Sequence, residues 1–252
     1  MLLPLSDDDR ALFRPAYVTH ALLWSNVLLF VLQQFFPELT YGWSMVPREI
    51  ATGQDIVGPV NVQTSDGSIA IMHYPGPSPV YLTLLTSMFL HGSLLHIAGN
   101  MLYLWIFGDN VEHRFGGLLF LGFYIITGLA GSLAEVVVDP SSVIPVLGAS
   151  GAISGVLGAY FVLYPRNRVY VLFFFVVLAL PASLVIGVWV LFQLLEGMGS
   201  LLGPRVGGVA YMAHLGGFIT GVFLAWPVRR MVREQEGHIF HHVATKYFQH
   251  RA

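Results

Sequence analysis

The chain has 252 residues, of which 55% are hydrophobic and only 10% are charged, and its mean hydropathy is +0.68. Soluble domains carry about 25% charged residues, so the composition predicts an integral membrane protein with a single helical domain. A net charge of -2 without a basic, aromatic-rich patch argues against a nucleic-acid partner. The absence of cysteine excludes disulfides, thiol catalysis and cysteine metal sites.

Uncharged apolar stretches predict six transmembrane helices, because a helix needs about 20 apolar residues to cross the bilayer core. The predicted spans cover residues 17–36, 90–107, 115–134, 147–164, 181–198 and 208–226. Asp7, Asp8 and Asp9 precede the first span, so we expect a retained anchor and not a cleavable signal peptide. Pro181 interrupts a long apolar run, and we interpret Val169–Leu180 as interfacial or partly buried.

Lys and Arg predict the orientation, since the cytoplasmic loops of membrane proteins are enriched in both. With the N-terminus inside, the following fall in the cytoplasm: Arg10, Arg14, Arg114, Arg166, Arg168, Arg229, Arg230, Arg233, Lys246 and Arg251. Only Arg48 and Arg205 fall outside. We therefore expect a cytoplasmic N-terminal segment (1–15), a six-span all-α domain (16–227) and a cytoplasmic tail (228–252) in a plasma membrane.

Three segments outside the spans carry further expectations. The first external loop, about Leu39 to Tyr81, is long enough to indicate a role, and its residues 61–74 alternate around a turn sequence as in a small hairpin. The Gly-rich stretch 197–208 is expected to be mobile. The tail contains His238, His241, His242 and His250, for which an amphipathic surface segment is favoured over a metal site.

Four polar residues fall in the outer half of the membrane in this topology. Ser150 lies in the first turn of the fourth span, and His214 lies about two turns into the sixth. His96 and Asn100 are four residues apart in the second span, which places them on one helix face. Because polar side chains at membrane depth are costly, such a group is by default a functional-site hypothesis.

These residue types fit nucleophilic catalysis. A neutral imidazole at His214 can remove the proton that makes Ser150 a poor nucleophile. His96, the Asn100 amide and the backbone N–H at the start of the fourth span can donate hydrogen bonds to a developing oxyanion. Since the proposed spans contain no Asp or Glu at this depth, the expected arrangement is a dyad without metal or cofactor. Polar contacts between helices are the alternative interpretation of His96 and Asn100, and structural roles are favoured for His20 and His91.

Glycines next to these residues predict close helix contact. Gly151 with Gly155 and Gly217 with Gly221 form two pairs with small-xxx-small spacing, which lets membrane helices approach backbone to backbone. A short serine side chain and a histidine on facing helices need such an approach to meet. Gly148 and Gly151 flank the nucleophile and are expected to help shape the oxyanion site.

At these residues the chain resembles the rhomboid family of intramembrane serine proteases, in its prokaryotic form. The resemblance rests on FLHGSLLHIAGNMLYLWIFGDNVEHRFG (89–116), GASGAISGVLGAY (148–160) and AHLGGFITG (213–221). It implies a six-helix rhomboid-like bundle in which Ser150 is the nucleophile, His214 the general base, and His96 and Asn100 part of the oxyanion hole. It also implies single-pass membrane proteins as substrates, with the fifth span and the 197–208 loop as gate and cap.

Two positions depart from the family pattern. Some members carry an aromatic residue one turn after the nucleophile, packed on the catalytic histidine. Here that position is Ser154, so we expect another residue to support the ring. The Trp-Arg pair often seen in the first loop is also absent, since Trp43 and Arg48 are separated.

Two other functions compete with the protease. A catalytically silent rhomboid-like chaperone or adaptor is the first, but such relatives usually lose the serine or the histidine. A small-solute transporter is the second, and it predicts polar groups throughout the bilayer depth together with related halves. Neither feature is visible in the sequence.

Overall fold

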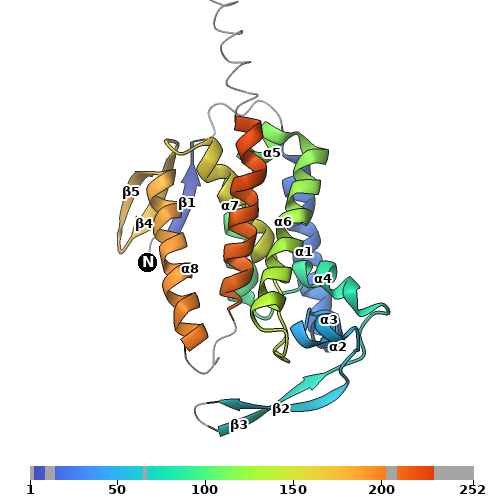
Figure 1. Cartoon of the computed structure of the whole chain (residues 1–252). Coiled ribbons are helices and arrows are strands. Elements are labelled where there is room, and N and C mark those ends of the chain that lie inside the picture. The colour runs from blue at the N-terminus through green and yellow to red at the C-terminus, as the bar shows by residue number, and fades with distance from the viewer. Residues whose placement is uncertain (1–2, 9–14, 65–66, 203–208, 230–252) are drawn as a thin grey trace, which may run out of the picture.

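The computed structural model describes residues 3–8, 15–64, 67–202 and 209–229 (Figure 1). Its elements, in chain order, are β1 (Leu3–Asp7), α1 (Tyr17–Phe35), α2 (Pro37–Trp43), α3 (Pro47–Thr52), β2 (Gly58–Thr64), β3 (Gly67–His73), η1 (Val80–Leu82), α4 (Thr83–Thr86), η2 (Ser87–Phe89), α5 (Leu94–Phe115), α6 (Gly117–Val138), α7 (Ser150–Leu163), β4 (Arg168–Phe173), β5 (Val176–Pro181) and α8 (Ala182–Leu202). A last helix, Tyr211–Arg229, follows. The His-rich tail and residues 203–208 of the predicted cap lie outside the described residues.

Helix α7 lies at the centre of the bundle. It packs against α5, α6 and α8, and eleven of its 14 residues are buried. Its neighbours contribute large side chains to the same core, among them Phe107 of α5 and Tyr124 of α6, neither of which is exposed. The nucleophile predicted at the start of α7 is therefore carried by the most enclosed helix of the described chain.

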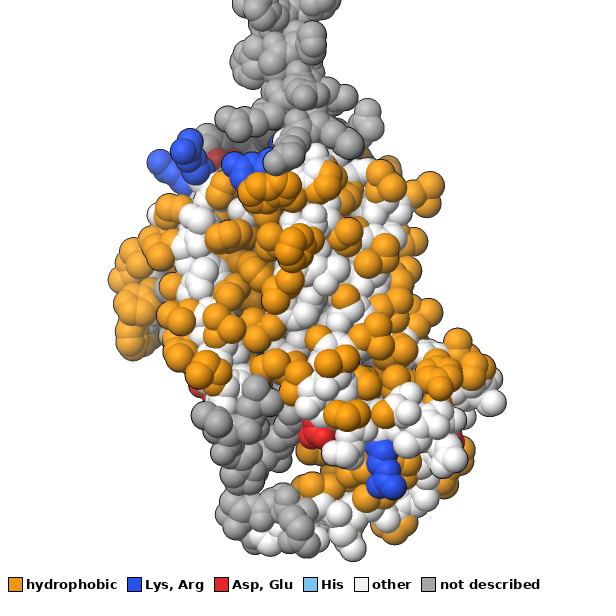
Figure 2. All heavy atoms as spheres, viewed as in Figure 1, with side chains coloured by type: hydrophobic (Ala, Val, Ile, Leu, Met, Phe, Trp, Pro, Cys, Tyr) orange, Lys and Arg blue, Asp and Glu red, His pale blue; other side chains and the backbone are white. Residues whose placement is uncertain are grey.

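The surrounding helices turn apolar side chains outward. Leu118 of α6 is 87% exposed, and Trp24 and Leu28 of α1 are similarly uncovered. Figure 2 shows an apolar band over the helices, with basic side chains gathered at its upper end and also present near its lower end. A soluble protein rarely exposes so large an apolar surface. The prediction of a helical membrane protein is confirmed.

Fewer helices are long enough to cross a membrane than the sequence predicts. Four helices of the described chain are long and apolar enough to cross: Tyr17–Phe35, Gly117–Val138, Ala182–Gly199 and Tyr211–Arg229. A fifth crossing requires Val80–Phe89 and Leu94–Phe115 to act together, although they meet at a 76° bend. Helix α7 extends only about 21 Å at 1.5 Å per residue, which is less than the roughly 30 Å hydrocarbon core. The count of six stays a prediction.

The expectation of an all-α fold is wrong. Val169–Leu180 forms two antiparallel strands, β4 and β5, and β1 adds to them in the order β1-β4-β5. The run is rich in β-branched and aromatic residues, which favour strands, but an apolar run of this length has no periodicity that separates strand from helix. In β1, Asp7 is buried and accepts a hydrogen bond from Asn110 at 2.9 Å.

The long first loop is ordered by short elements of its own. It contains α2, α3 and the predicted hairpin, which is confirmed as β2 paired with β3. Figure 1 places this hairpin at the end of the bundle opposite the C-terminal end of the last helix. The second predicted span also differs in its bounds: α5 begins at Leu94, where the Ser93 side chain caps it by accepting the His96 N–H at 3.2 Å, and continues to Phe115.

Candidate active site

Ser150 is the first residue of α7, directly after a sharp turn. Gly148 in this turn has a φ of +129°, which only glycine adopts at low cost. Its N–H donates to the Ser87 carbonyl at 2.9 Å, which ties the turn to the segment before α5. The backbone N–H groups at the start of α7 have no partner within the helix. They are therefore available to a negatively charged group beside Ser150.

His96 and Asn100 of α5 face this turn. A Cβ atom added to Gly148 would lie 2.7 Å from His96 Nε2 and 3.5 Å from Asn100 Nδ2. Both side chains therefore pack against the backbone just before Ser150, and glycine is required at position 148 for space as well as for backbone conformation. Within the described residues, the buried Asn100 Nδ2 has no hydrogen-bond partner. An unpaired buried donor is costly in a resting protein, and such exceptions call for an explanation.

His214 in the last helix is held by two side chains of α8. Its Nδ1 lies 2.6 Å from Gln193 Oε1. A carbonyl oxygen only accepts, so Nδ1 carries the hydrogen and donates it, which leaves Nε2 as an unprotonated base. Trp189 lies against the same ring, with centroids 6.1 Å apart and an interplanar angle of 36°. Gln193 and Trp189 thus support the His214 ring. Some rhomboid proteins use for this purpose an aromatic residue at the position that Ser154 occupies here.

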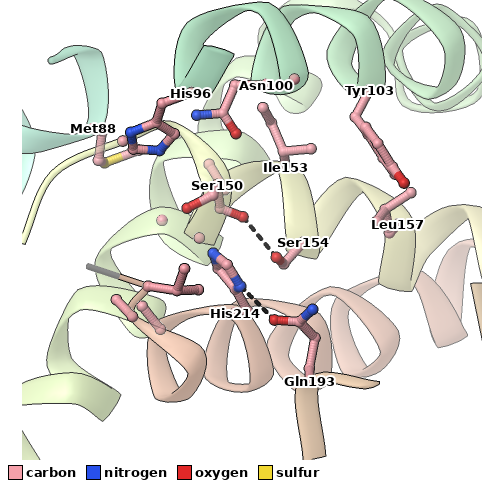
Figure 3. A pocket seen from close by; sticks show the side chains of 18 of the residues that line it. Met88, His96, Asn100, Tyr103, Ser150, Ile153, Ser154, Leu157, Gln193 and His214 are labelled. Atoms are coloured by element: carbon pink, nitrogen blue, oxygen red, sulfur yellow. Dashed lines mark hydrogen bonds between the residues drawn. The ribbon is translucent and has the colours of Figure 1, made fainter. Parts of the chain in front are cut away.

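One cavity of about 1020 Å³ connects these groups. Ser150, His214, His96 and Asn100 all line it, as do the glycines at 148 and 151. Figure 3 shows the His214 ring between Ser150 and Gln193, with His96 and Asn100 on the opposite side of Ser150. The described residues contain no hydrogen bond between Ser150 Oγ and His214. Catalytic hydrogen bonds are often long in free enzymes and shorten when substrate binds.

The glycine pairs lie where α7 meets the last helix. A Cβ on Gly217 would collide with the carbonyl oxygen of Gly151, and a Cβ on Gly221 would collide with that of Gly155. The two backbones are therefore in direct contact, which brings the start of α7 close to His214. The last helix is also tied to α6, because the Ala213 N–H donates to Glu135 Oε2 at 3.2 Å.

The remaining candidates do not join the cavity. His20 Nδ1 lies 2.6 Å from the Ala16 carbonyl, and His91 is buried, with its backbone N–H donating to Gln33 Oε1 at 3.1 Å. No three His, Asp or Glu side chains of the described chain converge as metal ligands. Gln193 and Trp189 were missed from the sequence. The single amide in the apolar stretch 182–195 was the available signal for Gln193.

Comparison with known proteins gives consistent matches. The model of the Rhomboid domain matches residues 79–231. Rhomboid protein 1, mitochondrial, of Saccharomyces cerevisiae is 34% identical over 159 residues, which is 61% of this chain and 44% of the relative. The Rhomboid protease GluP of Bacillus subtilis is 35% identical over 142 residues, or 56% of this chain and 25% of the relative.

A plant relative gives the same result. RHOMBOID-like protein 5 of Arabidopsis thaliana is 32% identical over 163 residues, which is 62% of this chain and 46% of the relative. The matches thus span less than half of the length of these relatives. The Rhomboid domain match covers more than half of this chain and includes every residue that lines the cavity. The chain belongs to the rhomboid family.

Proposed function

We propose that the chain is an intramembrane serine endopeptidase with a Ser150–His214 dyad. The observation that carries the proposal is the meeting of four polar side chains, from three helices, in one largely apolar cavity. The glycine contacts explain how the serine and the histidine are brought together, and the unpaired Asn100 amide is explained by a bond that forms only during the reaction. The name of the Bacillus subtilis relative, a rhomboid protease, supports the same activity.

The proposed reaction proceeds through an acyl-enzyme. His214 Nε2 accepts the Ser150 hydroxyl proton as Oγ attacks the substrate carbonyl carbon, and a tetrahedral oxyanion forms. The Asn100 amide, His96 and the N–H groups of Ser150 and Gly151 donate hydrogen bonds to this oxygen. The protonated His214 then gives its proton to the leaving amine as the peptide bond breaks. Water, activated by the same base, hydrolyses the ester and regenerates Ser150.

The proposal includes a topology and a substrate class. Six helical segments cross or enter the membrane, with α7 short and enclosed, both termini in the cytoplasm and the first loop outside. The site then opens to the external side, in a plasma membrane, and the substrates are single-pass membrane proteins cut in or near their transmembrane segments. Helix α8 is the proposed gate for such a segment, because only 22% of its residues Ala182–Gly199 are buried.

The test is cleavage of a model single-pass substrate after co-reconstitution in lipid vesicles. Wild type should cleave it, and Ser150→Ala and His214→Ala should not. Ser154→Ala is the matched control, because Ser154 also lines the cavity but donates its hydroxyl to the Ser150 carbonyl at 2.6 Å (Figure 3). Equal cleavage by wild type and Ser150→Ala would exclude the proposed nucleophile. A folded wild type that binds the substrate without cleaving it would favour the silent chaperone or adaptor.

A further inference from the structure

A second cavity, of about 900 Å³, opens at the end of the bundle away from the first loop. It lies where α5 and α7 end, beside the start of α8 and the last helix. Arg114, Arg166 and Arg229 line it, and none of the described residues in its lining is Asp or Glu. The enrichment of basic residues in cytoplasmic loops explains their presence at this end. It does not explain why three of them, from three separate segments, surround one cavity.

One of these arginines is held in place. The Arg114 guanidinium carbon lies 5.4 Å from the centre of the Tyr164 ring, within the range of a cation–π contact. The Tyr164 hydroxyl in turn donates to the Asn110 carbonyl at 3.0 Å. Arg166 and Arg229 are exposed, so their head groups can turn toward a ligand. The planar guanidinium is suited to bidentate bonds with phosphate.

The rest of the lining combines two polar side chains, Asn167 and Ser183, with an apolar wall. Phe161 and Val222 form part of the wall, and Trp226, which is 48% exposed, stands beside them. Tryptophan is enriched where hydrocarbon meets head groups. A free anion would use only the polar side of the cavity, whereas a lipid can place its phosphate among the arginines and its acyl chain along the apolar wall. We propose that the cavity binds the phosphate head group of an anionic membrane lipid, at the cytoplasmic end of the bundle.

The test measures lipid retained by the detergent-solubilised full chain in native mass spectrometry. The probes are phosphatidylglycerol and phosphatidylcholine with identical acyl chains, at equal concentrations. Wild type should prefer phosphatidylglycerol, and Arg166→Gln or Arg229→Gln should each weaken that binding about fivefold, as expected for one basic contact to an anionic lipid. Thermal unfolding in detergent verifies that each variant is folded.

The matched control is Arg168→Gln. Arg168 is two residues from Arg166, also exposed and of the same charge, but it does not line the cavity. It should retain the preference for phosphatidylglycerol. Equal losses in Arg166→Gln and Arg168→Gln would overturn the site, because the binding would then reflect general surface charge. A wild type without the preference would overturn it as well. Inorganic phosphate that displaces the lipid at equal concentration would overturn the assignment to a lipid.

Discussion

The two sides of the candidate site differ in how firmly the fold holds them. Helix α7, which carries Ser150, has eleven of 14 residues buried. Helix α8, which holds the His214 ring through Gln193, buries only Ala182, Val185, Ile186 and Gly197 among its described side chains. The proposed nucleophile thus lies on a helix that is fixed by packing, while the partner of the proposed base lies on a helix with a large membrane-facing surface. This difference is consistent with the proposed role of α8 as a gate beside a fixed Ser150.

The largest effect is expected on the fixed side, at Asn100. Asn100→Leu removes a donor to the proposed oxyanion, and we expect kcat to fall about 10²–10³-fold with little change in KM. The Asn100 Nδ2 is unpaired in the resting protein, so its removal should leave thermal stability equal or higher. Steady-state kinetics and thermal unfolding measure both quantities. A clear loss of stability with unchanged kcat would instead assign Asn100 to helix packing.

A second variant tests the contact that holds α7 against the last helix. Gly217→Ala places a methyl group on the Gly151 carbonyl, so α7 and the last helix must separate. Since a displacement of about 1 Å at a catalytic site costs about a hundredfold in rate, cleavage should fall by that order. Gly122→Ala on α6 is the control, because a Cβ there meets nothing within 4 Å. Equal activity of the two variants would show that the helix contact does not position the dyad.

The α8 side is tested through Gln193. Gln193→Leu removes the acceptor that orients His214 Nδ1–H. We expect the covalent labelling of Ser150 by a fluorophosphonate to slow about tenfold or more, because the wrong histidine tautomer becomes populated. Gln193→Glu retains an acceptor and should retain most of the rate. The comparison of labelling rates across pH separates an effect on the base from a general loss of structure. Unchanged labelling rates in Gln193→Leu would show that α8 does not orient His214.

The smallest effect on catalysis is expected in the first loop, which lies outside both sides of the site. Glu49 of α3 is buried, and this burial raises the pKa of its carboxyl to about 7, with Asp55 adding to the increase. The folded loop therefore favours the protonated acid. The associated stability is fully present below the unfolded pKa of about 4.3 and is lost as the pH rises through about 7.

Amide hydrogen exchange measures this loss at Ile56, whose N–H donates to Glu49 Oε1 at 3.1 Å. Glu49→Gln is the reference, because its loop has no titrating group at this position. Relative to this variant, the exchange rate of the Ile56 amide in wild type should increase by at most about tenfold per pH unit near neutrality, which is the limit for one titrating group. The rate of Ser150 labelling should show no such difference between wild type and Glu49→Gln. Identical exchange of the two proteins at every pH would contradict a raised pKa.

The sequence was most informative where a property is local. Uncharged apolar runs located six helical segments, five of them to within about four residues, although α5 continues to Phe115 and not to 107. The spacing of His96 and Asn100 placed both on one face of α5. The β1-β4-β5 sheet could not be found in this way, because β1 pairs with residues more than 160 positions away. The Gln193 contact with His214 depends on how α8 is rotated against the last helix. That rotation is a property of tertiary packing, which hydropathy does not contain.

The most direct test of the account is covalent labelling of the detergent-solubilised chain with a fluorophosphonate, followed by peptide mapping. This reagent reacts with a serine that a neighbouring base activates. We expect modification at Ser150 in wild type and in Ser154→Ala, and none in Ser150→Ala or His214→Ala. Modification of His214→Ala at the wild-type rate, or no modification of folded wild type, would contradict the Ser150–His214 dyad.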